Sequence, residues 1–125
     1  MTIKFAAIGL NHNHIYGQVD LMLRAGAEFV AFHSPEDDLA ATFGAKYPQA
    51  KRVATAAEIL EDRTIAMVLT AAIPADRAAI AIAAMQHGKD VMTDKPGMTS
   101  FAQLDEIKRV QAETGRIYSV CYSEH

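Results

Sequence analysis

The sequence is poor in the residues that mark several specialised classes of protein. It has one cysteine, Cys121, which excludes an internal disulfide framework and favours a reducing compartment, the cytoplasm. It has no tryptophan, and its other aromatic residues are few. No apolar run is long enough to cross a bilayer, so we expect no association with a membrane.

The sequence also has no large excess of charge of either sign. Twelve Lys and Arg residues against 15 Asp and Glu residues give a net charge of −3, and no basic run is present. Nucleic acid is therefore not an expected partner. A length of 125 residues, half of them hydrophobic, predicts one globular domain over residues 1–125.

Short apolar runs alternate with amphipathic segments along the whole chain. The pattern predicts strands near residues 3–9, 28–33, 52–53, 65–70, 89–93 and 116–122, with a helix between each pair. Such alternation is typical of an α/β protein with three layers, in which helices cover both faces of a doubly wound parallel sheet. We expect the Rossmann-like strand order 3-2-1-4-5-6, with the flavodoxin-like order as the alternative.

Glycine and cap residues predict where several helices begin and end. One helix is expected from His14 to Arg24, with Gly26 just past its end. In Ser34-Pro35-Glu36-Asp37, we predict Ser34 as the N-cap, a proline at the first helical position and acids in the first turn.

The junction between the first strand and the first helix reads IGLNHNHIYG, over residues 8–17. A loop that binds pyrophosphate sits at such a junction, and Gly9 can supply its tight turn. In the pattern G-x-G-x-x-G, Asn11 and His14 stand where the second and third glycines belong. Asparagine tolerates left-handed backbone conformations better than most residues do. The alternative is that Asn11 or Asn13 merely caps the helix.

The histidines of this loop raise the question of a metal site. His12 and His14, with His33 as a third candidate, could ligate a metal. No cysteine lies near them, and two ligands do not make a site. We therefore expect no metal.

The end of the second strand is the next diagnostic position in a dinucleotide-binding fold. An acid about 20 residues past the glycine loop often binds the adenosine ribose there. The count falls on Ser34, or on His33, and neither is acidic. A serine does not repel a 2′-phosphate, so both NAD and NADP stay open. Glu36 and Asp37 lie slightly further along.

The second half of the chain carries a family pattern. Four segments follow one another: Ala71-Ala72-Ile73-Pro74-Ala75-Asp76-Arg77, Gly88-Lys89-Asp90-Val91, Asp94-Lys95-Pro96 and Cys121-Tyr122-Ser123. They resemble the T-P-x-x-x-H, G-K-H-V, E-K-P and G-Y-N segments of the glucose–fructose oxidoreductase/inositol dehydrogenase family (Gfo/Idh/MocA). The resemblance covers essentially the whole chain, and the D-K-P segment is its most specific part.

The resemblance implies a function and a set of site residues. This domain would bind NAD or NADP, and Lys95 would be the catalytic lysine beside the nicotinamide and the substrate hydroxyl. A cation there can stabilise negative charge on oxygen or assist proton transfer. The reaction implied is hydride transfer to or from a sugar, cyclitol or related polyol. The cofactor-binding residues implied are Gly9, Leu10, Asn11, His12, Asn13, His14, Ser34, Ala71, Ala72, Ile73, Asp94, Lys95 and Pro96.

Members of that family carry a second α/β domain after the sixth strand, which supplies most substrate contacts. The chain stops where that domain would begin, so we expect a fragment of a longer protein, negligible turnover by this chain alone, and a homo-oligomeric parent. Two alternatives use the same fold without catalysis. One is a nucleotide-binding sensor, and the other is a structural module that binds no nucleotide.

Overall fold

The computed structural model describes residues 3–10, 14–71, 74–94, 101–116 and 118–121. The strands are β1 (Lys4–Ile8), β2 (Glu28–His33), β3 (Lys51–Arg52), β4 (Ile65–Thr70), β5 (Asp90–Asp94) and β6 (Tyr118–Cys121). The helices are α1 (His14–Arg24), α2 (Asp37–Lys46), α3 (Ala56–Leu60), α4 (Pro74–Gln86) and α5 (Phe101–Thr114). The predicted alternation of strands and helices is confirmed.

The strands form one parallel sheet in the order β3-β2-β1-β4-β5-β6. This confirms the predicted doubly wound order and excludes the flavodoxin-like alternative. The chain starts in the middle of the sheet, moves outward through β2 and β3, and then returns to β4 on the other side of β1. The order therefore reverses between β1 and β4, which is where ligands bind in open α/β sheets.

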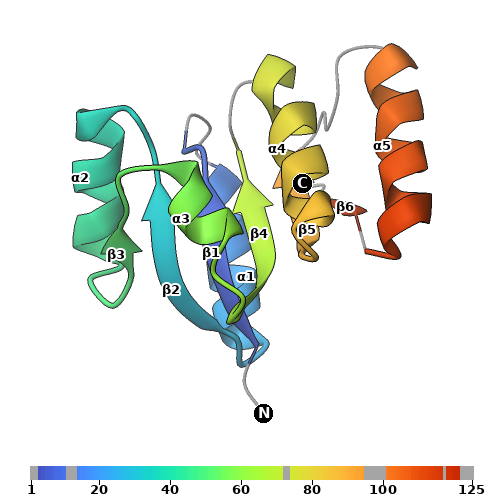
Figure 1. Ribbon diagram of the computed structural model, residues 1–125. Coiled ribbons are helices and arrows are strands. Elements are labelled where there is room, and N and C mark those ends of the chain that lie inside the picture. Colours follow the sequence, from blue (N-terminus) through green and yellow to red (C-terminus); the bar gives the residue numbers. More distant parts are fainter. Residues whose placement is uncertain (1–2, 11–13, 72–73, 95–100, 117, 122–125) are drawn as a thin grey trace.

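Helices cover both faces of the sheet (Figure 1). Residues of α1 and α2 share one hydrophobic cluster with Phe5 and Leu69, whereas α3, α4 and α5 share the other with Ala6 and Val68. Neighbouring residues of one strand thus contribute to opposite layers, as the alternation of side chains along a strand requires.

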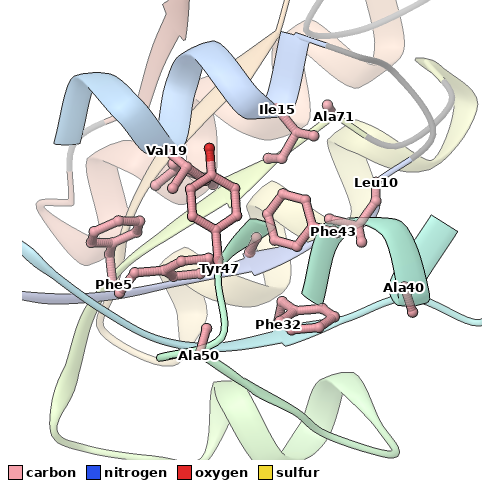
Figure 2. Close-up of a cluster of buried hydrophobic side chains, with 13 residues drawn as sticks. Phe5, Leu10, Ile15, Val19, Phe32, Ala40, Phe43, Tyr47, Ala50 and Ala71 are labelled. Carbon is pink, nitrogen blue, oxygen red and sulfur yellow. The ribbon is translucent and has the colours of Figure 1, made fainter. Parts of the chain in front are cut away.

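Aromatic rings fill the layer beneath α1 and α2 (Figure 2). Phe5 and Phe29 stack with their ring centroids 5.0 Å apart, and Phe43 meets Phe32 edge-on at 5.1 Å. Tyr47 joins the cluster from the end of α2, and its hydroxyl points toward α1. These contacts fix α1 and α2 on the sheet.

Candidate functional site

Gly9 follows β1 and is hydrogen-bonded to the ends of the strands on either side of β1, β2 and β4. Its backbone N–H donates to the carbonyl of His33 at the end of β2, with an N···O distance of 3.0 Å. Its own carbonyl accepts from the N–H of Ala71, just past β4, at 3.2 Å. With a φ of 88°, Gly9 adopts a left-handed conformation that favours glycine. The turn predicted for Gly9 is thus present at the carboxyl edge of the sheet.

The first turn of α1 suits an anion. The helix begins at His14, as predicted, and has no acidic residue in its first turn. By contrast, the first turn of α2 holds Asp37 and Asp38. Because the N-terminus of a helix carries partial positive charge and free N–H groups, α1 can receive a pyrophosphate, whereas the acids of α2 would repel one.

Buried apolar residues form a floor under this part of the carboxyl edge. Leu10 follows β1 and is 4% exposed, Ala71 follows β4 and is fully buried, and Ile15 of α1 is fully buried. Figure 2 shows Ile15 and Ala71 close together beside the start of α1. The side chains of these three residues belong to the core, so they do not obstruct the approach of a phosphate to this edge.

Ser34 does not cap a helix, contrary to the prediction. The N-cap of α2 is Glu36, which makes no side-chain capping hydrogen bond, and the helix begins at Asp37. The Ser34 hydroxyl instead accepts from the N–H of Glu36 at 3.3 Å and donates to its carboxylate at 2.7 Å. A serine that bonds the backbone two residues ahead forms a local turn, which competes with the capping geometry.

A pocket of about 470 Å³ opens at the carboxyl ends of β2 and β3. It is lined by His33, Ser34, Pro35, Arg52, Val53 and Ala54. Nη2 of Arg52 donates to the Ser34 carbonyl at 3.0 Å and to Oδ1 of Asp37 at 2.8 Å. The imidazole ring of His33 points toward the end of β3, with its Nδ1 3.2 Å from the carbonyl oxygen of Val53. The pocket lies beside the strand end where a dinucleotide fold binds ribose.

The structure brings together Gly9, Leu10, Ser34 and Ala71, all at the carboxyl edge. For His14 and Asp94 it gives the position of the backbone, at the start of α1 and the end of β5. The other predicted site residues lie outside the described residues: Asn11, His12, Asn13, Ala72, Ile73, Lys95 and Pro96.

Sequence reasoning missed Arg52 and left Glu36 unassigned. Arg52 is distant in sequence, and its place follows from the pairing of β2 with β3, in which Phe32 lies opposite Arg52. The signal that could have found Arg52 is its position on the predicted third strand. The carboxyl ends of adjacent parallel strands share one edge of the sheet, so a cation there lies near the end of the second strand.

The sequence analysis also considered a metal site and a membrane-spanning segment. No group of three or more His, Cys, Asp or Glu side chains in the described ranges is placed to hold a metal ion. No described helix combines the length and apolar character needed to cross a membrane.

A sequence profile of the Gfo/Idh/MocA family, an oxidoreductase family with an NAD-binding Rossmann fold, matches residues 3–122. The chain belongs to this family. Family membership agrees with the strand order, the turn at Gly9 and the start of α1, and it makes the chain an NAD-binding domain of the oxidoreductase type. No curated protein matches the chain.

Solved structures share the fold over nearly the whole chain. A proposed oxidoreductase from Erwinia carotovora atroseptica SCRI1043 is 39% identical, with a TM-score of 0.95 over 98% of this chain and 37% of its own. Biliverdin reductase from Synechocystis sp. PCC 6803, solved with biliverdin and NADP⁺, is 21% identical, with a TM-score of 0.83 over 94% of this chain and 36% of its own.

Myo-inositol 2-dehydrogenase from Lactobacillus plantarum is 18% identical, with a TM-score of 0.83 over 97% of this chain and 36% of its own. The chain thus spans a little over a third of the length of these solved structures.

Proposed function

We propose that the chain is the cofactor domain of an enzyme that moves a hydride between NAD or NADP and a hydroxyl-bearing small molecule. The substrate class we favour is a sugar, cyclitol or related polyol. The observation that carries the proposal is Gly9, held between β2 and β4 at the reversal of strand order, in a chain of the Gfo/Idh/MocA family. A reducing, cytoplasmic setting is supported by the single cysteine.

The described residues fit a dinucleotide. Gly9 turns sharply without a side chain, and α1 starts within five residues of it with no acid in its first turn. We assign the pyrophosphate to the segment from Gly9 to His14, through Leu10, Asn11, His12 and Asn13. The adenosine ribose would lie at the pocket beside Ser34, and Ala71, Ala72 and Ile73 would line the cleft after β4.

The reacting end of the cofactor would lie at the end of β5. Asp94 ends that strand, and Lys95 and Pro96 follow it in sequence. The nicotinamide ring, when bound, accepts or supplies the hydride. We propose that the Lys95 ammonium holds the substrate hydroxyl and stabilises negative charge that develops on its oxygen. This role follows from the family resemblance of the Asp94-Lys95-Pro96 segment.

The substrate class rests on the family, of which an inositol dehydrogenase is one structural neighbour. The chain spans a little over a third of that neighbour, so we place most substrate contacts in a second domain of a longer protein. We accordingly expect this chain to bind cofactor with negligible turnover, and the longer protein to form a homo-oligomer.

The proposal is tested in two steps. The first is calorimetric titration of the chain with NAD⁺, NADH, NADP⁺ and NADPH, where binding of at least one is expected. The second is an activity assay in which the longer protein is mixed with each of a panel of sugars and cyclitols, and the absorbance of the reduced nicotinamide is followed. Lys95→Ala should lower turnover by about 10²-fold or more, the range typical of a lost acid–base or charge-stabilising group.

Lys108→Ala is the matched control, since Lys108 is an exposed lysine on α5. Its turnover should equal that of the unaltered protein. Cofactor binding without turnover on any polyol, in the longer protein, would favour the nucleotide sensor. A folded chain that binds no dinucleotide, alone or in the longer protein, would favour the structural module.

A further inference from the structure

The carboxylate of Glu36 is brought back to the end of β2 by a two-residue turn. Dinucleotide-binding folds distinguish their cofactors here, since an acid binds the ribose diol of NAD and an arginine accommodates the 2′-phosphate of NADP. Ser34 occupies that position, but its hydroxyl is 2.7 Å from Oε1 of Glu36 and the residue is only 1% exposed. The Ser34 hydroxyl therefore holds the Glu36 carboxylate beside this strand end.

The rival to Glu36 at this strand end is Arg52 of β3. Its guanidinium lines the pocket, as an arginine that binds a 2′-phosphate would. However, Nη2 of Arg52 is already shared between Oδ1 of Asp37 and the Ser34 carbonyl, at 2.8 and 3.0 Å. The positive charge is thus balanced by Asp37, and the arginine holds the turn that carries Glu36.

The local balance of charge opposes a second phosphate. Three acids, Glu36, Asp37 and Asp38, stand in sequence at the start of α2, against Arg52 on β3. A 2′-phosphate would bring negative charge to this group and be repelled, whereas a neutral diol would donate to the carboxylate of Glu36.

We propose that Glu36 binds the adenosine ribose hydroxyls and selects NAD over NADP, with Ser34 as the residue that positions it. The proposal rests on the cofactor site described under Proposed function. Glu36 replaces the acid that the sequence lacks at the end of β2, two residues further along the chain.

The experiment compares NAD⁺ with NADP⁺ on the chain by calorimetric titration. The unaltered chain should bind NAD⁺ at least about tenfold more tightly than NADP⁺. Glu36→Gln removes the charge and keeps the shape, and should weaken NAD⁺ binding by about tenfold, as expected for the loss of a hydrogen bond to a charged group. The same variant should bind NADP⁺ equally well or better, since one repulsive charge is gone.

Two further variants separate the effect of position from that of charge. Ser34→Ala removes the hydroxyl that positions the carboxylate and should lower the NAD⁺/NADP⁺ preference severalfold, a ratio that a merely structural role would leave unchanged. Asp105→Asn is the matched control, because it removes the same charge from an exposed residue of α5, outside this group of acids. Its preference should stay within about twofold of the unaltered chain. Far-ultraviolet circular dichroism confirms that each variant is folded.

The outcomes distinguish this proposal from the one on which it rests. A chain that binds NADP⁺ as tightly as NAD⁺, or that keeps its preference in Glu36→Gln, would overturn the role of Glu36 and leave cofactor binding intact. Loss of NADP⁺ binding in Arg52→Gln, in a chain that prefers NADP⁺, would give the selective role to Arg52. A folded chain that binds neither dinucleotide would overturn both proposals.

Discussion

At the scale of single residues, the backbone conformation of Gly9 is the feature that most constrains the site. A left-handed φ of 88° costs a residue with a side chain about 1–2 kcal/mol, because Cβ approaches the following carbonyl oxygen. Gly9→Ala should therefore lower the free energy of unfolding by about that amount in urea titrations. The hydrogen bonds to His33 and Ala71 leave the turn little freedom to relax.

Gly17 provides the matched control for Gly9. It lies inside α1, where an added Cβ would meet no heavy atom within 4 Å. Gly17→Ala should stabilise the protein by roughly 0.5–1 kcal/mol, since alanine favours a helix interior. Equal effects of the two substitutions would contradict the strain assigned to Gly9.

Tyr47 gives the protein a predictable response to alkali. Burial and the hydrogen bond from its hydroxyl to Asp20, at 2.7 Å, raise the pKa of this phenol above its ordinary value. A raised pKa in the folded state means that stability is fully present below about pH 10, where the unfolded phenol is still protonated. Above that pH the unfolded state loses protons that the folded state keeps, so stability falls as pH rises.

The prediction for Tyr47 concerns the slope of stability with pH. Tyr47→Phe should cost about 1 kcal/mol at neutral pH through the lost hydrogen bond, and should flatten the decline above about pH 10. Tyr16→Phe, which changes a neighbouring ring of the same cluster, should leave the decline in place. Urea unfolding at a series of pH values measures both, and an unchanged slope in Tyr47→Phe would refute the assignment.

At the scale of elements, the end of α1 was predicted well, because one residue, Gly26, decides it. Gly26, Gly88 and Gly115 all have positive φ just past the ends of α1, α4 and α5. The residue just past a helix often has to adopt a left-handed backbone conformation, and glycine adopts it without steric cost. The bounds of β4 follow from its continuous apolar run.

The start of α2 was predicted wrongly because two local hydrogen-bond patterns compete for one hydroxyl. Ser34 could cap the helix or form a turn with Glu36, and both patterns use the same sequence signal. Arg52 decides between them, since it holds the Ser34 carbonyl and Asp37 from the adjacent strand. A contact between residues so far apart in sequence is fixed by the sheet, and local pattern does not reveal it.

Lys89 ties the turn before β4 to the turn before β5. Its ammonium donates to the carbonyls of Asp62 and Ile65 at 2.6 and 2.8 Å, and the residue is 2% exposed. Burial lowers the pKa of Lys89, an effect that the charge of Asp62 partly offsets. The lysine of the Gly88-Lys89-Asp90-Val91 segment therefore has a structural role at the edge opposite the cofactor site.

Lys89→Met keeps the apolar stem and leaves two carbonyls without their donor. We expect it to destabilise the fold by about 1–3 kcal/mol, the range for an unsatisfied buried group. Lys108→Met, at an exposed position of α5, should change stability by less than about 0.5 kcal/mol. Thermal and urea unfolding compare the two, and similar stabilities would show that the bonds of Lys89 contribute nothing.

At the scale of the whole molecule, the site follows from the strand order more than from any motif. The altered glycine loop is a weak signal, yet the order β3-β2-β1-β4-β5-β6 places Gly9, Ser34 and Ala71 at one edge. Alternating elements and right-handed crossovers leave few other arrangements for such a chain. What the order does not specify is which side chains of neighbouring elements meet there, as the contact between Asp37 and Arg52 shows.

Because the site belongs to the folded sheet, cofactor binding should stabilise the whole molecule. A ligand that binds only the folded state adds about 2.7 kcal/mol at a hundred times its Kd, and roughly 1.4 kcal/mol for each further tenfold rise in concentration. For a domain of this size the first of these corresponds to a rise in Tm on the order of 10 °C. The rise should continue with concentration of NAD⁺, without a plateau at saturation of the site. A Tm that stays constant over that range would show that the carboxyl edge of the folded chain does not hold the dinucleotide.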